Sequence, residues 1–215
     1  MRFQDRADAG RRLAELLRDY EGRADVVVLA LPRGGVPVGH EVAKSLGVPL
    51  DVFVVRKLGV PGHQELAMGA IASGGLVVLN PGVTKALGIS DESLRRVFET
   101  ERRELRRRED LYRGTHEPPE VEGKTVILVD DGLATGSTMR AAALAVRQLN
   151  PERVVVAVPV AAEQTCEEFR DVVDDVVCAV TPRPFYAVGL WYDDFSQTSD
   201  EAVRGLLVEA AEARR

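Results

Sequence analysis

Short apolar runs alternate along this chain with segments whose apolar residues recur every three or four positions. Residues 26–31 are an apolar run of strand length, and residues 50–55 are a second strand-length segment that is apolar except for Asp51. Between them Val38, Val42 and Leu46 fall on one helical face before Gly47. Short apolar runs predict buried strands, and the longer spacing predicts a helix. Two strands joined by a helix form a βαβ unit, so we expect these strands to be parallel.

The same pattern recurs in the second half of the chain. We expect strands over residues 125–129, 154–158 and 176–180, with helices over 137–149 and 163–171 between them. The first of these helices turns an apolar face inward, formed by Met139, Ala142, Ala143, Val146 and Leu149. Because the strands are rich in Val and Ile, we expect helices on both faces of the sheet. The pattern predicts an α/β fold with a Rossmann-like, mostly parallel sheet.

Two amphipathic segments and one glycine-rich segment surround this core. Leu13, Leu16, Leu17 and Tyr20 have helical spacing, and residues 200–213 are typical of a closing helix. Residues 56–75 are rich in glycine and poor in large apolar side chains. We expect a mobile loop over Leu58 to Met68, then a hairpin formed by residues 67–72 and 76–79.

A highly charged helix is expected between the two halves, over residues 90–114. It holds eight arginines, and Glu99 and Glu104 each precede an arginine by four positions, at Arg103 and Arg108. Such pairs stabilise a solvated helix. The arginines also suggest a phosphate or RNA surface, but interleaved acidic residues dilute their charge. We therefore favour a solvated or oligomer-facing helix.

Composition narrows the class of protein. The chain has 215 residues and a net charge of −6, which argues against general nucleic-acid binding. No apolar run approaches the roughly 20 residues of a membrane span, and the N-terminal residues lack the apolar core of a signal peptide. Cys166 and Cys178 have no metal-like spacing, and we expect both to be reduced thiols in a cytoplasmic protein.

The stretch that carries chemistry begins with Asp130 and Asp131, directly after the apolar run 126–129. The carboxyl ends of strands in an open α/β sheet are where ligands bind. Two adjacent carboxylates repel each other, and hydroxyl groups or a cation stabilise them. A ribose with vicinal hydroxyls would suit the pair.

Small and hydroxylated residues follow, in the order Ala134, Thr135, Gly136, Ser137 and Thr138. They lead into a helix, whose N-terminal amides and dipole favour an anion such as a phosphate. In the simpler interpretation Thr135 or Ser137 only caps the helix and the aspartates form a solvated turn. The order of strand, acid pair and loop favours a sugar-phosphate site. The chain contains neither a Walker A motif nor a dinucleotide-binding glycine motif after the first strand.

Residues 126–138 resemble the signature with which type I phosphoribosyltransferases bind phosphoribosyl pyrophosphate (PRPP). The resemblance extends over residues 26–180 and implies that Asp130 and Asp131 bind the ribose hydroxyls, directly or through Mg²⁺. It implies that residues 134–138 bind the 5-phosphate. In the family the turn after the first strand binds pyrophosphate through a strained peptide, which corresponds here to Arg33, Gly34 and Gly35. A basic residue opens the catalytic loop, and here that residue is Lys57.

The acceptor side departs from the family at one position. Purine phosphoribosyltransferases have an aspartate thought to act on the base where this chain has Ala134, which puts a hypoxanthine- or guanine-type mechanism in doubt. The segment 182–199 is the candidate hood over the acceptor, and Phe185, Trp191 and Tyr192 are its stacking candidates. These aromatics alternatively form the hydrophobic seal of the domain. His63 in the expected loop is interpreted as incidental.

The resemblance implies an enzyme that transfers phosphoribosyl from PRPP to a small nitrogenous acceptor such as a nucleobase, with Mg²⁺ as cofactor. The alternative is a non-catalytic PRPP-sensing regulator of the same fold. A PRPP synthetase-like protein is disfavoured because the chain is too short for two tandem domains. We expect one domain over 1–215, with a core over 24–181, an inserted helical segment over 88–114 and a hood with closing helix over 182–215. Proteins of this fold often form dimers, so a homodimer is compatible with the resemblance.

Overall fold

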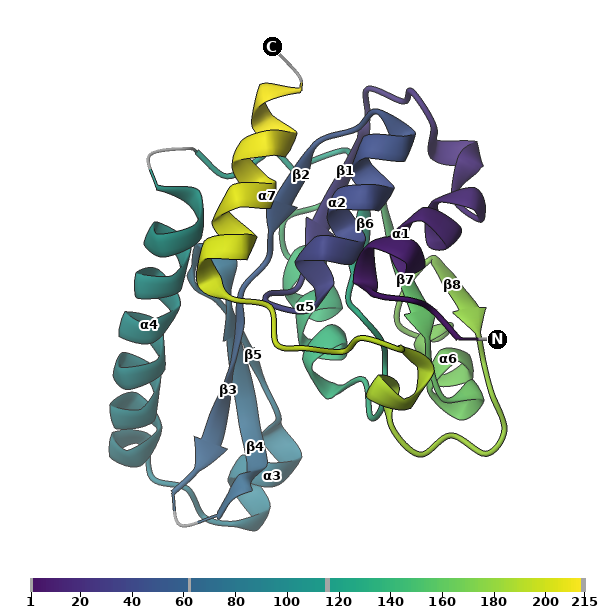
Figure 1. Cartoon of the computed structure of the whole chain (residues 1–215). Helices are drawn as coiled ribbons and strands as arrows, with labels where there is room; N and C mark the ends of the chain where they lie inside the picture. The colour runs from purple at the N-terminus through teal and green to yellow at the C-terminus, as the bar shows by residue number, and fades with distance from the viewer. Residues whose placement is uncertain (1, 62, 115–116, 214–215) are drawn as a thin grey trace.

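The computed structural model describes residues 2–61, 63–114 and 117–213, and its centre is a parallel sheet of five strands (Figure 1). The strands lie in the order β2-β1-β6-β7-β8, and each neighbouring pair is parallel. Their bounds are β1 Val26–Ala30, β2 Leu50–Val52, β6 Thr125–Val129, β7 Arg153–Val160 and β8 Asp175–Val180. The expected α/β class and mostly parallel sheet are confirmed.

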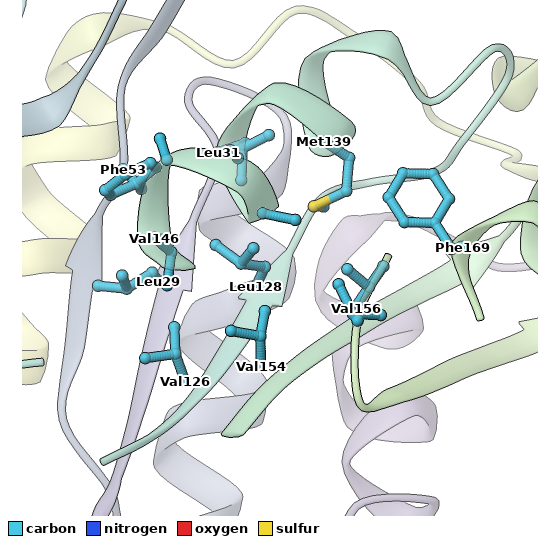
Figure 2. Close-up of a cluster of buried hydrophobic side chains, with 14 of the residues drawn as sticks. Leu29, Leu31, Phe53, Val126, Leu128, Met139, Val146, Val154, Val156 and Phe169 are labelled. Carbon is cyan, nitrogen blue, oxygen red and sulfur yellow. The ribbon is translucent and has the colours of Figure 1, made fainter. Parts of the chain in front are cut away.

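Helices cover both faces of the sheet, with α1 and α2 on one face and α5 and α6 on the other. Their bounds are α1 Arg6–Glu15, α2 Gly35–Leu46, α5 Ser137–Arg147 and α6 Glu163–Phe169. Successive strand residues point to opposite faces. In β6, Val126 and Leu128 therefore join the cluster around Met139 of α5 (Figure 2), whereas Ile127 and Val129 join the cluster under α2. Burial on both faces explains why the strand is apolar throughout.

The apolar face expected for the N-terminal helix is only partly confirmed. Leu13, Leu17 and Tyr20 are buried, but Leu16 is 55% exposed. The α-helix ends at Glu15, and the chain continues as the 3₁₀ turn η1 (Arg18–Tyr20), so helical spacing no longer holds across residues 16–20. Leu16 is the C-cap residue of α1, where the regular helix and its apolar spacing end.

The order of the strands creates a crevice between β1 and β6. The chain leaves β1 through α2 to β2 on one side, and it leaves β6 through α5 to β7 on the other. The two connections run in opposite directions from the β1–β6 pair. Such a place is a topological switch point, where ligands of open α/β sheets bind. The turn after β1 and the loop after β6 therefore border the same crevice.

A second, antiparallel sheet of three strands follows β2 and extends away from the main sheet (Figure 1). Its strands are β3 Val55–Val60, β4 His63–Ala72 and β5 Leu76–Leu79, the last two joined by η2 Ser73–Gly75. The hairpin expected from residues 67–72 and 76–79 is confirmed as β4 and β5. The expected strand 50–55 is divided, because β2 ends at Val52 and β3 begins at Val55.

The mobile loop expected over Leu58 to Met68 is wrong for most of its length. Leu58, Val60 and Met68 lie in β3 or β4 and are buried. The register of the pairing shifts on both sides of Gly59, an irregularity that glycine tolerates in a strand. Few apolar residues in this segment are large, but those few point the same way and pack towards α4. Gly62 lies outside the described residues.

Helix α4 (Asp91–Arg113) flanks the second sheet, and short α3 (Pro81–Ala86) precedes it. The Glu104 carboxylate contacts Arg108, as expected, and also Arg107, both at 2.8 Å. The Glu99 carboxylate contacts Arg102 at 3.6 Å, and the expected Arg103 donates instead to the backbone carbonyl of Glu99 at 3.3 Å. Ten of the 23 residues of α4 are exposed and two are buried, which agrees with the solvated interpretation for its outer face.

The end of α4 is fixed to the main sheet by a nearly buried ion-pair cluster. Arg113 Nε donates to Asp51 Oδ2 at 2.7 Å, and Arg113 Nη1 donates to Glu109 Oε1 at 3.0 Å. Arg113 Nη2 also donates to the carbonyl of Val52 at 2.7 Å. The last helix, α7 (Asp200–Glu212), packs against both α2 and α4. Among the described residues, no helix is long and apolar enough to cross a membrane.

The expectation of two reduced cysteines is wrong. Cys166 of α6 and Cys178 of β8 form a disulfide, with their Cα atoms 6.9 Å apart. The pairing depends on how closely α6 packs on β8, which the spacing of two cysteines in the sequence does not reveal.

Candidate active site

The carboxylates of Asp130 and Asp131 follow β6 at the carboxyl edge of the main sheet. Residues 126–129 are completely buried, so the strand fixes where the two aspartates emerge. Both aspartates are half-buried. Oδ1 of Asp130 accepts a hydrogen bond from the backbone N–H of Asp131 at 2.8 Å. The Tyr192 hydroxyl donates to the backbone carbonyl of Asp131 at 2.6 Å, which ties the acid pair to the C-terminal segment.

Burial makes this acid pair costly to ionise. It raises the pKa of Asp130 well above the ordinary value, and the nearby charge of Asp131 raises it further. Burial also raises the pKa of Asp131, while the Arg6 guanidinium opposes that rise. The pair is therefore predisposed to bind a cation or hydroxyl donors, which stabilise its charged form.

Arg6 is a residue of this site that the sequence pattern did not indicate. Its Nε and Nη2 atoms both lie 2.9 Å from Oδ2 of Asp131. Its Nη1 donates to the carbonyl of Ser196 at 2.7 Å, and its guanidinium lies 4.0 Å from the centroid of the Phe195 ring. Arg6 therefore connects α1, the acid pair and the C-terminal segment.

One local feature could have indicated a special role for Arg6. It is the first residue of α1, after the N-cap Asp5, and a cation in the first turn opposes the helix dipole. Such a placement needs a compensating partner, and Asp131 provides it here. The identity of that partner depends on the tertiary fold, so the sequence alone did not supply it.

The loop after the acid pair ends at an uncapped helix. Gly136 is the N-cap of α5 with a φ of 66°, and in the described structure no side chain caps this terminus. The simpler interpretation, in which Thr135 or Ser137 caps the helix, is therefore not supported. Ala134, Thr135 and Ser137 are exposed, and Thr138 is half-buried. Free amides of a first helical turn and nearby hydroxyls form a site suited to an anion.

Packing from behind holds this loop in place. The Thr165 hydroxyl of α6 donates to the carbonyl of Ala134 at 2.8 Å. A Cβ atom on Gly136 would lie 2.6 Å from Cε2 of Phe169, so glycine is required both for space and for its left-handed conformation. Leu133 donates its N–H to the carbonyl of Val160 at 2.9 Å. The loop is thus fixed by β7 and α6 while its outer surface stays open.

The turn after β1 lies beside the acid pair. β1 ends at Ala30, and the N–H of Leu31 donates to the carbonyl of Val129 at 2.8 Å. The peptide bond between Pro32 and Arg33 is cis. Cβ atoms built on Gly34 and Gly35 would overlap atoms of Asp131 and Asp130. The two segments expected to hold pyrophosphate and ribose are therefore adjacent.

The two expected cationic residues lie in different environments. A guanidinium nitrogen of Arg33 is 3.9 Å from a carboxylate oxygen of Asp200, which also accepts a hydrogen bond from the Tyr112 hydroxyl at 2.8 Å. Lys57 lies on β3 with an exposed side chain and lines a groove of about 540 Å³ between β3 and α4. The roles assigned to Arg33 and Lys57 remain predictions.

The aromatic residues proposed for the acceptor side differ in exposure. Tyr192 is buried, with its ring 5.5 Å from that of Phe3 and 5.0 Å from that of Phe195. Phe185 and Trp191 are partly buried against the same cluster. This packing favours the interpretation of these three residues as a hydrophobic seal. Their contact with an acceptor remains a prediction.

His40, the histidine whose side chain the structure describes, adds no group to this site. His40 is buried in α2, 3.6 Å from a carboxylate oxygen of Glu209. His63 lies at the start of β4, and its side chain is not among those that the structure describes. His116 lies outside the described residues.

The acid pair provides oxygen ligands of the kind that Mg²⁺ prefers. Among the described residues, no three or more His, Cys, Asp or Glu side chains gather in a metal-binding cluster. Mg²⁺ nevertheless commonly binds through one or two carboxylates together with substrate phosphates. Asp130 and Asp131 therefore fit a magnesium ion that arrives with a phosphorylated ligand.

Comparison with known proteins agrees with the fold. The family model for the phosphoribosyl transferase domain matches residues 2–189. A protein of Mycobacterium tuberculosis (strain H37Rv) named "Putative phosphoribosyl transferase Rv0571c" is 46% identical over 208 residues, which cover 97% of this chain and 47% of that protein. The chain thus spans about half the length of the curated relatives it matches first.

Two further proteins extend the comparison. The crystal structure of TT1426 from Thermus thermophilus superposes with a TM-score of 0.87 at 45% identity, covering 97% of this chain and 99% of that one. "Bifunctional protein PyrR" of Chloroflexus aurantiacus is 36% identical over 129 residues, or 59% of this chain and 65% of that protein.

Proposed function

This chain belongs to the phosphoribosyl transferase family, and from that premise we propose that it transfers the phosphoribosyl group of PRPP to a small nitrogenous acceptor. The observation that carries the proposal is the succession of Asp130, Asp131 and the uncapped N-terminus of α5 within one loop. That loop borders the crevice between β1 and β6. A single segment thereby provides hydrogen-bond acceptors for the ribose hydroxyls and hydrogen-bond donors for a phosphate.

In the proposed reaction, the C1 atom of the ribose loses pyrophosphate and gains a bond to the acceptor nitrogen. Asp130 and Asp131 bind the ribose hydroxyls, and residues 134–138 bind the 5-phosphate through backbone amides and hydroxyls. Positive charge develops on the ribose as the bond to pyrophosphate breaks. The half-buried carboxylates beside it stabilise that charge in surroundings of low dielectric.

The leaving pyrophosphate is assigned to the turn after β1. Gly34 and Gly35 allow the ligand to approach the backbone, and Arg33 provides a cation at the edge of the crevice. Lys57 is assigned the same task from β3. Mg²⁺, when bound by Asp130 and Asp131 with PRPP, neutralises phosphate charge and so makes pyrophosphate a better leaving group.

The exposed methyl group of Ala134 bears on the acceptor. This position offers no carboxylate to remove a proton from the acceptor nitrogen or to donate one. The proposal therefore favours acceptors that are nucleophilic without a base at this position, such as amines or bases already in the reactive tautomer.

The first experiment is titration calorimetry with PRPP and Mg²⁺, followed by an assay of pyrophosphate release with a panel of nucleobases and amines. PRPP binding and release with at least one acceptor are expected. If PRPP does not bind, the proposed site is wrong. Binding without release for any acceptor would instead favour the second candidate below.

The second candidate is a PRPP-sensing regulator that does not catalyse transfer. It is favoured by Ala134 and by the exposed arginines of α4, among them Arg95, Arg103 and Arg106. A gel-shift assay with RNA and DNA, with and without PRPP, tests it. A PRPP-dependent shift combined with no pyrophosphate release would identify this role, whereas the net charge of −6 opposes it.

A further inference from the structure

Arg6 holds the acid pair from outside the loop that carries it. Its side chain is only 12% exposed, and that of Asp131 is 16% exposed. Besides Asp131, the guanidinium contacts the carbonyl of Ser196 and the ring of Phe195. A side chain held on three sides and largely shielded from water is costly to displace, so it is not a loosely held counter-ion.

The contact is selective for one carboxylate oxygen. Both Arg6 nitrogens address Oδ2 of Asp131, and Asp130 uses its own Oδ1 to accept the Asp131 N–H. Within residues 2–61, 63–114 and 117–213, no hydrogen bond engages Oδ1 of Asp131 or Oδ2 of Asp130. Each aspartate therefore keeps one oxygen for a ligand, while its other oxygen is fixed by the protein.

The start of α1 is itself fixed to the C-terminal segment. The N–H of Phe3 donates to the carbonyl of Trp191 at 2.8 Å, and the N–H of Asp193 donates to the carbonyl of Phe3 at 2.9 Å. The N–H of Asp194 donates to the carbonyl of Gln4 at 2.8 Å. Arg6 thus extends from a backbone that the hood segment holds in register.

We propose that Arg6 is a positioning residue for the sugar: by holding Oδ2 of Asp131, it directs Oδ1 of that carboxylate to a ribose hydroxyl. The proposal rests on the proposed function, since it assumes that a ribose phosphate occupies the crevice. It adds that the N-terminal helix and the hood segment set the geometry of ribose binding. Arginine suits this task because its planar fork reaches one oxygen with two donors.

The test compares three variants of the 215-residue chain by calorimetry. Arg6→Met removes the charge and the donors, and Arg6→Lys keeps the charge but loses the fork. Arg2→Met is the matched control, because Arg2 also joins the N-terminus to the hood, through the carbonyls of Leu190 and Tyr192. The probes are PRPP with Mg²⁺, ribose 5-phosphate without metal, and inorganic phosphate.

Arg6→Met is expected to raise the Kd for ribose 5-phosphate and PRPP by about tenfold or more. This is the effect expected when the ribose hydroxyl loses its hydrogen bond to the charged Asp131, which Arg6 no longer holds in place. Its Kd for inorganic phosphate is expected to stay unchanged, because inorganic phosphate has no ribose and would contact only the loop at the start of α5. Arg6→Lys should recover part of the loss, and Arg2→Met should bind all three probes like the wild type.

Equal effects of Arg6→Met and Arg2→Met would overturn the proposal, since both would then act through attachment of the hood. Tighter sugar binding by Arg6→Met would also overturn it, because Arg6 would then compete with the ligand. If Arg6→Met does not fold, Arg6→Lys decides: an unchanged Kd for ribose 5-phosphate refutes the role. A wild-type protein that binds neither sugar phosphate refutes the proposed function itself.

Discussion

Gly34 lies directly against Asp131, although the two residues belong to different loops. A Cβ atom on Gly34 would lie 2.7 Å from Cγ of Asp131 and closer still to its Oδ2. At the next position, a Cβ atom on Gly35 would lie 2.8 Å from Cα of Asp130. The turn after β1 can approach the acid pair only because it has no side chains there.

This contact predicts the effect of a single methyl group. Gly34→Ala should displace the Asp131 carboxylate or the turn, because neither can move without losing the contact with Arg6 or the start of α2. We expect a loss of roughly 1–3 kcal/mol in the free energy of unfolding, typical of overpacking. PRPP binding should weaken as well. Urea denaturation and calorimetry measure the two effects.

Gly205 provides the matched control for that substitution. It lies exposed inside α7, and nothing stands within 4 Å of a Cβ atom built on it. Gly205→Ala should therefore raise the free energy of unfolding by about 0.5–1 kcal/mol through helix propensity, with PRPP binding unchanged. If both alanine variants behaved alike, the close approach of Gly34 to Asp131 would be wrong.

A second prediction concerns the cost of ionising Asp130. Because burial raises the pKa of this carboxyl in the folded chain, the folded state binds its proton more tightly than the unfolded chain does. Protonated Asp130 therefore costs the folded state nothing at low pH. As pH rises from about 4, the ordinary pKa of the unfolded chain, to the raised pKa of the folded chain, the free energy of unfolding decreases. Asp130→Asn cannot ionise, and its Oδ1 can still accept the Asp131 N–H.

Asp130→Asn should consequently have a higher Tm than the wild type at pH 8, and the gain should shrink towards pH 4. Its PRPP affinity should fall by at least about tenfold, because a charged hydrogen-bond acceptor is lost. The exposed Asp171 offers a control in Asp171→Asn, which should change neither quantity. A lower Tm for Asp130→Asn at pH 8 would contradict the electrostatic argument.

The accuracy of the sequence predictions follows the range of the interactions involved. The bounds of β6 agree with the prediction residue for residue, because a local apolar run ends abruptly at Asp130. β3 was missed because Arg56, Lys57 and Gly59 interrupt its apolar pattern, and because its partners β4 and α4 stabilise it. The contact between Arg6 and Asp131 joins distant parts of the chain, so only the fold reveals it.

The part of the candidate site that is formed by residues close in the sequence was predicted, and the contacts between distant residues were not. The acid pair and the residues 134–138 lie only two residues apart in the sequence, and the helix that follows them has a clear apolar period. The turn at Gly34 could be named, but its contact with Asp131 depends on β1 and β6 being neighbours. The Cys166–Cys178 disulfide likewise depends on the packing of α6 against β8.

A third prediction tests the ion-pair cluster that fixes α4. Arg113→Met leaves Asp51 and Glu109 without their shared partner, and burial already raises the pKa of Asp51. Removing one partner of a buried ion pair in this way lowers the free energy of unfolding by about 3–5 kcal/mol. Arg96→Met on the same helix breaks only an exposed pair with Glu92 and should cost about 0–1 kcal/mol. Unfolding in denaturant measures the free energy of unfolding of both variants. Equal decreases for Arg113→Met and Arg96→Met would contradict the claim that the buried cluster stabilises the attachment of α4.

The last prediction concerns the disulfide behind the 5-phosphate loop. Cys166 neighbours Thr165, whose hydroxyl holds the carbonyl of Ala134, so the bond to Cys178 anchors the helix that supports the loop. Closing a short loop typically stabilises a protein by about 2–4 kcal/mol. Cys166→Ala combined with Cys178→Ala should lower the Tm accordingly, and a reducing agent should lower the wild-type Tm to a similar extent.

The same double variant should also bind inorganic phosphate and PRPP more weakly, because α6 then holds Ala134 and Gly136 less firmly. A reducing agent should leave the double variant unaffected, which separates the disulfide from any general effect of the reagent. If Ellman's reagent finds two free thiols in unfolded wild type that has not been reduced, then the two cysteines are not paired and the anchoring argument for α6 is wrong.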